Sequence, residues 1–194
     1  MVSFDLFGVR LRLDFSFFAA VGIFLALDRT GYGICCLSAC FCHEAGHLAV
    51  MLIEKKLPEE IIFSGGGICI KRRGDASLAV LAAGCLVNFL LFWVYCFSLP
   101  HDNIFKLLFG GANLAIGLFN LLPVGELDGR RILEKVCFRL FSFSAAEKVL
   151  KVAGFLGYIA AAVAAAFLVI SGRVNLTAVT VMVYVFLMDF LIRN

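Results

Sequence analysis

Residues Thr30 to Ile53 read TGYGICCLSACFCHEAGHLAVMLI, an apolar stretch long enough to cross a bilayer. Its middle carries three ionisable residues, His43, Glu44 and His47. Positions i and i+4 of a helix lie on one face, so both imidazoles are expected to reach one metal ion. Ionisable residues inside a membrane span are costly and usually functional. The alternative is a chance match to this pattern in a buried helix.

The composition places this stretch in a membrane protein. Of the 194 residues, 62% are hydrophobic and 16% charged, against about 45–50% and 25% in soluble domains. These values exclude a disordered chain, and the net charge of +3 gives no nucleic-acid-binding footprint. The eight cysteines lie mostly in apolar runs, where a free cysteine behaves as a small hydrophobe.

Apolar stretches between charged residues predict an all-α polytopic membrane protein with one domain, residues 1–194. About six transmembrane helices are expected, at 15–27, 30–53, 76–100, 107–125, 152–172 and 174–192. If the N-terminus faces the cytoplasm, only three of the 17 Lys and Arg residues lie on the opposite side: Arg29, Lys106 and Arg173. We therefore expect an integral, multi-pass protein of a bacterial cell membrane with both termini cytoplasmic.

Two segments between the predicted spans have structure of their own. Residues 61–70 alternate around Gly65, Gly66 and Gly67, which predicts a short β-hairpin on the cytoplasmic side. Residues 128–141 form an apolar helical stripe opposite basic side chains, which is typical of an interfacial amphipathic helix. The hairpin offers an edge to which an unwound peptide can add as a strand, or it is a plain interfacial turn.

A zinc site needs a third ligand, and Asp128 is the main candidate. Pro123 cannot continue a helix, so the fourth span is expected to break near Asn120. Unwound backbone at membrane depth is tolerated where it lines a polar cavity, which places Glu126 and Asp128 near such a cavity. From the residues alone, Asp128 is equally well explained as the N-cap of the amphipathic helix.

The two motifs together resemble the site-2 protease family of intramembrane zinc metalloproteases. The resemblance rests on His43-Glu44-x-x-His47 and on Asn120-x-x-Pro123-x-x-x-x-Asp128-Gly129. The chain is similar to the small sporulation-factor-like branch, without a PDZ insert or an appended regulatory domain. The family's Gly-Pro-x-x-Asn pattern corresponds to residues 84–88, with Cys85 in place of proline.

The resemblance implies one Zn²⁺ held by His43, His47 and Asp128, with Glu44 activating the hydrolytic water. It implies that Asn120 binds the substrate backbone or the oxyanion. It implies a role of the same kind for Asn88, the last residue of the 84–88 pattern, and for the hairpin glycines Gly65, Gly66 and Gly67. The expected activity is hydrolysis of a peptide bond in the transmembrane segment of a membrane protein, typically a regulator of transcription. The expected partners are the lipid bilayer and a regulatory membrane protein, and no nucleic acid.

Two other interpretations remain open from the sequence. Cys36 and Cys40 share a helical face with His43 and His47, which is compatible with a mixed Cys/His site. A metal-binding transporter or sensor without hydrolysis is the alternative function. Transporters more often have broken helices in both halves of the chain, and this sequence predicts one break.

Overall fold

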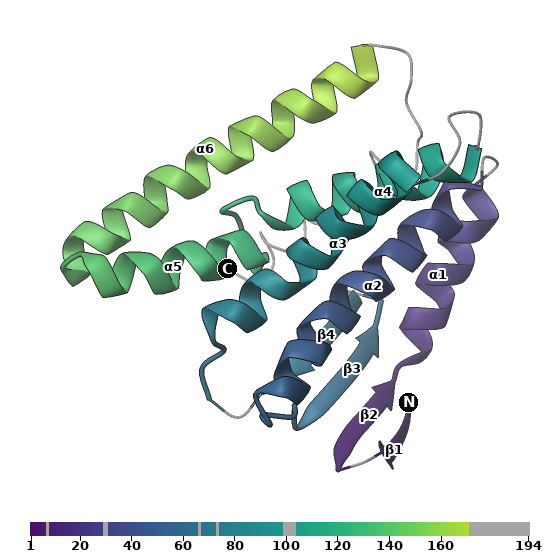
Figure 1. Ribbon diagram of the computed structural model, residues 1–194, viewed down its shortest axis with the longest axis horizontal. Coiled ribbons are helices and arrows are strands. Elements are labelled where there is room, and N and C mark those ends of the chain that lie inside the picture. The colour runs from purple at the N-terminus through teal and green to yellow at the C-terminus, as the bar shows by residue number, and fades with distance from the viewer. Residues whose placement is uncertain (7, 29–30, 66, 73, 99–103, 171–194) are drawn as a thin grey trace. The chain divides into compact units, whose positions relative to one another are not determined.

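The computed structural model describes residues 1–170 except 7, 29–30, 66, 73 and 99–103 (Figure 1). The chain divides into two compact units, residues 1–117 and 118–194. The first contains the four strands, the first three helices and most of the fourth. Their bounds are β1 Val2–Leu6, β2 Val9–Leu13, α1 Phe15–Leu27, α2 Tyr32–Ile53, β3 Glu60–Ser64, β4 Gly67–Lys71, α3 Leu78–Ser98 and α4 Ile104–Asn120.

The strands form one sheet in the order β1-β2-β3-β4. The predicted hairpin is confirmed as β3 and β4, which pair antiparallel, and β2 pairs with β3 in parallel. The strands β1 and β2 were not predicted, although their apolar residues alternate regularly with polar ones. An ion-pair group joins three strands, because the Glu60 carboxylate lies 3.2 Å from Arg12 on β2 and 3.4 Å from Lys71 on β4.

Helices α2 and α3 run side by side in the first unit (Figure 1). Small residues make this possible: a Cβ atom on Gly46 would lie 2.9 Å from both the Ala83 carbonyl oxygen and a Val87 methyl group. Helix α4 packs against α2 through a cluster of buried residues that includes Ala39 and Ala112, both fully buried. The backbones therefore approach closely, as is common between transmembrane helices.

The second unit contains the end of α4, a loop, α5 Asp128–Leu140 and α6 Phe143–Ile170. The predicted amphipathic helix is confirmed as α5, which packs against α6 around buried Cys137, Ala146 and Leu150. The Arg130 guanidinium donates a hydrogen bond of 2.8 Å to the Leu150 carbonyl and joins the two helices.

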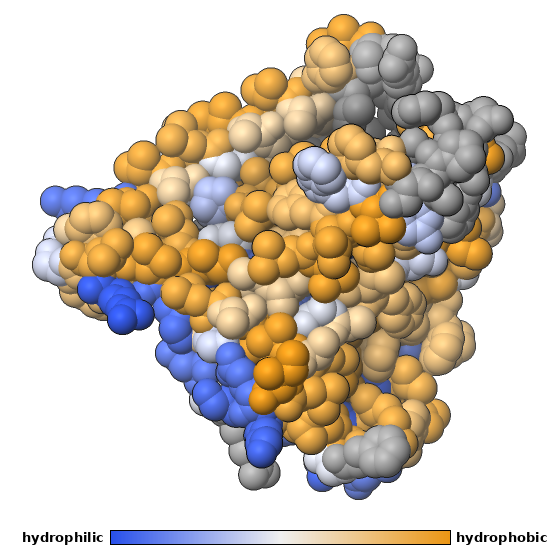
Figure 2. All heavy atoms as spheres, in the orientation of Figure 1, coloured by the Kyte–Doolittle hydropathy of each residue, from blue (hydrophilic) through white to orange (hydrophobic). Residues whose placement is uncertain are grey.

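Three described helices are long and apolar enough to cross a membrane: α2, α3 over Leu78–Phe97 and α6 over Phe143–Phe167. Helix α1 and the segment Leu107–Asn120 are apolar but shorter. Large apolar side chains are exposed along the helices (Figure 2), among them Leu86, Leu90, Trp93 and Phe97 in one stripe of α3. Such surfaces are typical of helices that face lipid, and they indicate an integral membrane protein. Six spans are not established, and the span predicted at 174–192 lies outside the described residues.

Two helices are bounded differently from the predicted spans. Helix α4 ends at Asn120, where the break was expected, and the predicted span bound of 125 lies beyond it, because Pro123 has no N–H group and disfavours helical backbone in the residue before it. Helix α6 begins at Phe143, nine residues before the predicted span begins at 152. Its first turns carry Glu147, Lys148 and Lys151, so the apolar pattern marks only the later part of the helix.

Candidate metal centre

The two histidines of α2 converge as their spacing predicts. His43 and His47 are buried, with 4% and 7% of their surface exposed. Their Nε2 atoms lie 3.1 Å apart, and the two rings meet edge to face. The i, i+4 spacing therefore brings one nitrogen from each ring to a common point.

Hydrogen bonds determine which nitrogen of each ring carries the proton. The Nδ1 atom of His47 lies 2.6 Å from the Val80 carbonyl oxygen, and a carbonyl can only accept. The Nδ1 atom of His43 lies 2.7 Å from Oδ1 of Asn88. In the neutral rings both Nδ1 atoms are thus donors, and both Nε2 atoms present lone pairs.

The orientation of Asn88 is itself determined by its other contacts. Its Nδ2 group donates to the Ala39 carbonyl at 3.1 Å and to Oδ1 of Asn113 at 2.8 Å. Asn113 in turn donates to the Phe109 carbonyl at 2.9 Å. Since backbone carbonyls only accept, both amides have one possible orientation, and Oδ1 of Asn88 must face His43.

This geometry corrects the predicted substrate-binding role of Asn88. The side chain is fully buried, both N–H groups of its amide are used, and its oxygen accepts from His43. Asn88 therefore orients the imidazole of His43 and has no donor left for a substrate. Partners of this kind select the histidine tautomer and strengthen the ligand.

Two lone pairs 3.1 Å apart repel each other unless a metal ion or a proton lies between them. Nitrogen ligands of a tetrahedral zinc ion, about 2.0–2.1 Å from the metal, are about 3.3 Å apart. The observed separation is close to this value. The pair His43 and His47 therefore fits two positions of a zinc site.

Gly84 of α3 provides the space beside these nitrogens. A Cβ atom there would lie 2.5 Å from Nε2 of His47 and 2.7 Å from Nε2 of His43. Any side chain at position 84 would thus occupy the space next to both Nε2 atoms, where an ion held by the two histidines would have to lie. The site requires glycine here for room, and Gly84 was not among the predicted site residues.

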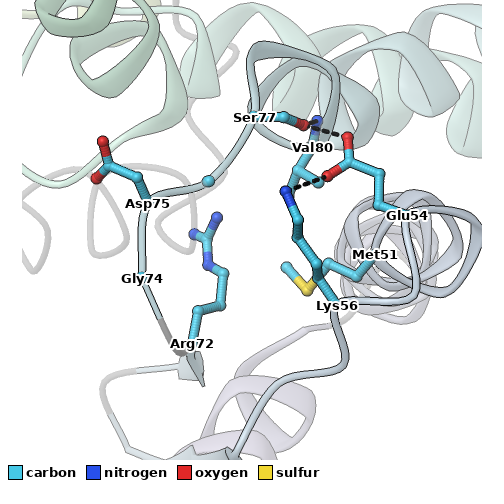
Figure 3. A pocket seen from close by; sticks show the side chains of 9 residues that line it. Met51, Glu54, Lys56, Arg72, Gly74, Asp75, Ser77 and Val80 are labelled. Atoms are coloured by element: carbon cyan, nitrogen blue, oxygen red, sulfur yellow. Dashed lines mark hydrogen bonds and ion pairs between the residues drawn. The ribbon is translucent and has the colours of Figure 1, made fainter.

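Val80, whose carbonyl oxygen faces Nδ1 of His47, lies in the first turn of α3 beside Ser77 (Figure 3). Ser77 accepts a hydrogen bond of 3.1 Å from the Val80 amide and donates to the Glu54 carboxylate at the end of α2. Lys56 lies 3.7 Å from the same carboxylate. These residues line a hollow of about 20 Å³, room for about one water molecule. The contacts fasten the end of the histidine-bearing helix to the first turn of the next helix.

Other residues of α2 occupy different positions. Glu44 lies between the two histidines in sequence and is half-buried. Cys36 packs against the apolar cluster shared by α2 and α4, and Cys40 is exposed. Among the described residues, the group of side chains that could hold a metal ion therefore includes the two histidines but neither cysteine.

In the second unit, Asp128 is the buried first residue of α5. Leu127 occupies the N-cap position, so the expected alternative of Asp128 as the N-cap is wrong. A Cβ atom on Gly129 would overlap the Leu121 carbonyl, and one on Gly157 of α6 would lie 2.7 Å from Val124. The loop before Asp128 is thus packed closely by two glycines. Asn120, the last residue of α4, is half-buried.

The glycines predicted to bind substrate differ from one another. The Gly65 amide donates to the Ser16 hydroxyl at 2.9 Å, so this residue ties the hairpin to α1, and its role in substrate binding stays a prediction. Gly67 begins β4 with φ +108°, a conformation that favours glycine. Gly66 lies outside the described residues.

Sequence reasoning missed Gly84, Val80 and Asn113 as parts of the site. Gly84 and Asn88 belong to one motif, but nothing in the sequence shows that the glycine faces the imidazoles. Val80 acts through its backbone, which leaves no trace in residue type. Asn113 gives a weak signal, because it is an amide in the middle of an apolar helix.

No protein-family model matches the sequence, and no curated protein matches it. A search of solved structures finds a site-2 protease from Methanocaldococcus jannaschii, with a TM-score of 0.62 and 21% sequence identity. The alignment covers 94% of this chain and 91% of that protein. The similarity therefore extends over nearly the whole of both chains, and the expected resemblance is confirmed in the fold.

Proposed function

We propose that the chain is an intramembrane zinc endopeptidase of the site-2 protease family, which cleaves a transmembrane segment of a membrane-bound protein. The observation that carries the proposal is the pair of buried Nε2 atoms of His43 and His47, which lie 3.1 Å apart. Both histidines belong to a His-Glu-x-x-His sequence on one helix. The shared fold supports the assignment independently.

His43, His47 and Asp128 are the proposed zinc ligands, and each offers one ligand atom. Two imidazoles and a carboxylate leave one position open, the arrangement of a catalytic rather than a structural zinc site. When bound, zinc supplies a Lewis acid that polarises the scissile carbonyl and makes water more acidic. The packed loop before Asp128 supports the role of this residue, since a ligand must be held in place.

Glu44 is the proposed general base. It follows His43 directly, so it leaves the helix within the same turn as the zinc-binding face. Its carboxylate takes a proton from the hydrolytic water and passes it to the leaving nitrogen. Asn120, at the broken end of α4, is proposed to donate a hydrogen bond to the substrate backbone or the oxyanion.

The substrate is proposed to bind as an extended strand. A transmembrane helix keeps its carbonyls in internal hydrogen bonds, so it must unwind before a peptide bond can be attacked. Strand β4 ends the sheet order, and β3 is its only strand partner in the described part of the chain. Its other edge is thus able to accept an added strand. A membrane-bound regulator of transcription is the proposed kind of substrate.

The test is cleavage of a model transmembrane substrate by the reconstituted protein and by its Glu44→Gln variant. Wild type should cleave the substrate, and Glu44→Gln should not, while both bind zinc equally. Glu59→Gln, a change of the same kind outside the site, should cleave as wild type does. Unchanged turnover in Glu44→Gln would refute the assigned role. Metal flux in proteoliposomes without proteolysis would favour a transporter.

A further inference from the structure

A second hollow lies in the groove between α5 and α6, and none of the proposed zinc, catalytic or substrate-binding residues lines it. Its volume is about 250 Å³, below the range of about 300–1,000 Å³ usual for pockets that enclose a whole small molecule. It is lined by six residues of the second unit: Arg130, Leu150, Lys151, Gly154, Phe155 and Tyr158. Two of these are cations and none is acidic.

The hollow follows from spacing on α6. Lys151, Gly154, Phe155 and Tyr158 occupy positions i, i+3, i+4 and i+7, so they share one helix face. Gly154 adds no side chain to the middle of that face, and it lies beside the guanidinium: a Cβ atom there would be 3.5 Å from the Pro123 carbonyl oxygen and 3.8 Å from Nη1 of Arg130. The groove therefore presents cationic groups at one end and aromatic rings at the other.

The Arg130 guanidinium has more N–H donors than its hydrogen bond to Leu150 uses. One N–H group of its guanidinium binds the Leu150 carbonyl at 2.8 Å. An arginine has five N–H groups, and a pre-oriented guanidinium suits the oxygens of a phosphate. The bond to Leu150 thus holds the guanidinium at the groove and leaves further donors for an anion.

The position of Lys151 relates the groove to the membrane surface. It is the last charged residue of α6, and the next nineteen residues, 152–170, carry no charge. The boundary between water and lipid is therefore expected at Lys151, the depth at which phospholipid headgroups lie. Phe155 is 66% exposed one turn further along, where an acyl chain would begin.

We propose that this groove binds the phosphate of an anionic phospholipid, with Arg130 and Lys151 as its cationic contacts and Phe155 against the acyl chain. Basic pockets between helices at the cytoplasmic face are suited to such headgroups. The inference rests on the membrane insertion in the proposed function but not on proteolysis. Its failure would leave zinc binding and cleavage unchanged.

The test is native mass spectrometry of the full, zinc-loaded chain in a non-ionic detergent, titrated with phosphatidylglycerol or phosphatidylcholine. Phosphatidylglycerol should bind more tightly. Lys151→Gln should weaken its binding about fivefold, the factor expected for one cation beside an anionic lipid. The matched control is Lys148→Gln, an exposed cation of the same helix that does not line the groove, and it should bind as wild type does.

Arg130→Gln should weaken binding at least as much, but this change also removes the link to Leu150. If the arginine variant does not fold, the binding of phosphatidylglycerol by Lys151→Gln alone tests the proposal. Equal affinity in wild type and Lys151→Gln would overturn the proposal, as would equal binding of both lipids. Displacement of phosphatidylglycerol by millimolar inorganic phosphate would assign the groove to free phosphate and would overturn the lipid assignment.

Discussion

The Nδ1 atom of His43 lies 2.7 Å from Oδ1 of Asn88, so a residue of α3 determines which nitrogen of the α2 histidine is available to a metal. The same asparagine is held by the Ala39 carbonyl and by Asn113. A line of buried amides thus runs from α4 through α3 to the imidazole. The orientation and tautomer of the His43 ring therefore depend on the packing of α2, α3 and α4.

The first prediction concerns this line of amides. Asn88→Ala should lower zinc affinity about tenfold to a hundredfold, the usual cost of removing a hydrogen-bond partner of a ligating histidine. Asn113→Ala should lower it less, because Asn88 keeps its bonds to His43 and Ala39. Competition with a chromophoric chelator measures both values. Wild-type affinity in Asn88→Ala would show that the tautomer of His43 does not depend on this contact.

The second prediction concerns space. Gly84→Ala should abolish stoichiometric zinc binding, because the new methyl group would stand 2.5–2.7 Å from both Nε2 atoms. Gly110→Ala on α4 is the matched control, since its nearest neighbours would be 3.7 Å away, an ordinary contact. Metal analysis of the folded variants distinguishes them. Full zinc content in Gly84→Ala would mean that the ion binds elsewhere.

The third prediction concerns pH and the sheet. Burial of the Glu60 carboxylate opposes its ionisation, but hydrogen bonds and attraction from Arg12 and Lys71 outweigh burial and hold the pKa of Glu60 below its ordinary value. A lowered pKa in the folded state stabilises the fold above the unfolded pKa of about 4.3. This stabilisation is lost as the pH falls through the folded value.

Hydrogen exchange of the β3 amides in wild type and Glu60→Gln measures this effect. Above about pH 4.3 the variant should exchange faster, and the difference should shrink progressively at lower pH. Glu147→Gln, which changes an exposed acid of α6, should show no such pH-dependent difference in β3. If the β3 amides of Glu60→Gln still exchange faster than those of wild type at the lowest pH, by an undiminished factor, the ion-pair account is contradicted.

Sequence reasoning succeeded where the relevant contacts are local. The spacing of His43 and His47 alone predicts that the two rings lie together, because residues four apart share one face of a helix. The hairpin and the amphipathic α5 were also predicted from their own residues. The role of Asn88 was not, because its partner is 45 positions away and becomes a neighbour only when α2 and α3 pack. The alternation in β1 and β2 was present but was not recognised as strand.

Zinc content tests the central claim most directly. The purified wild-type chain should hold one zinc ion, His43→Ala and His47→Ala should hold none, and Asp128→Ala should bind zinc with clearly lower affinity. Glu126→Ala, an exposed acid two residues before Asp128, should bind as wild type does. A wild-type chain without zinc, or equal affinity in Asp128→Ala and wild type, would contradict a site made from these three residues.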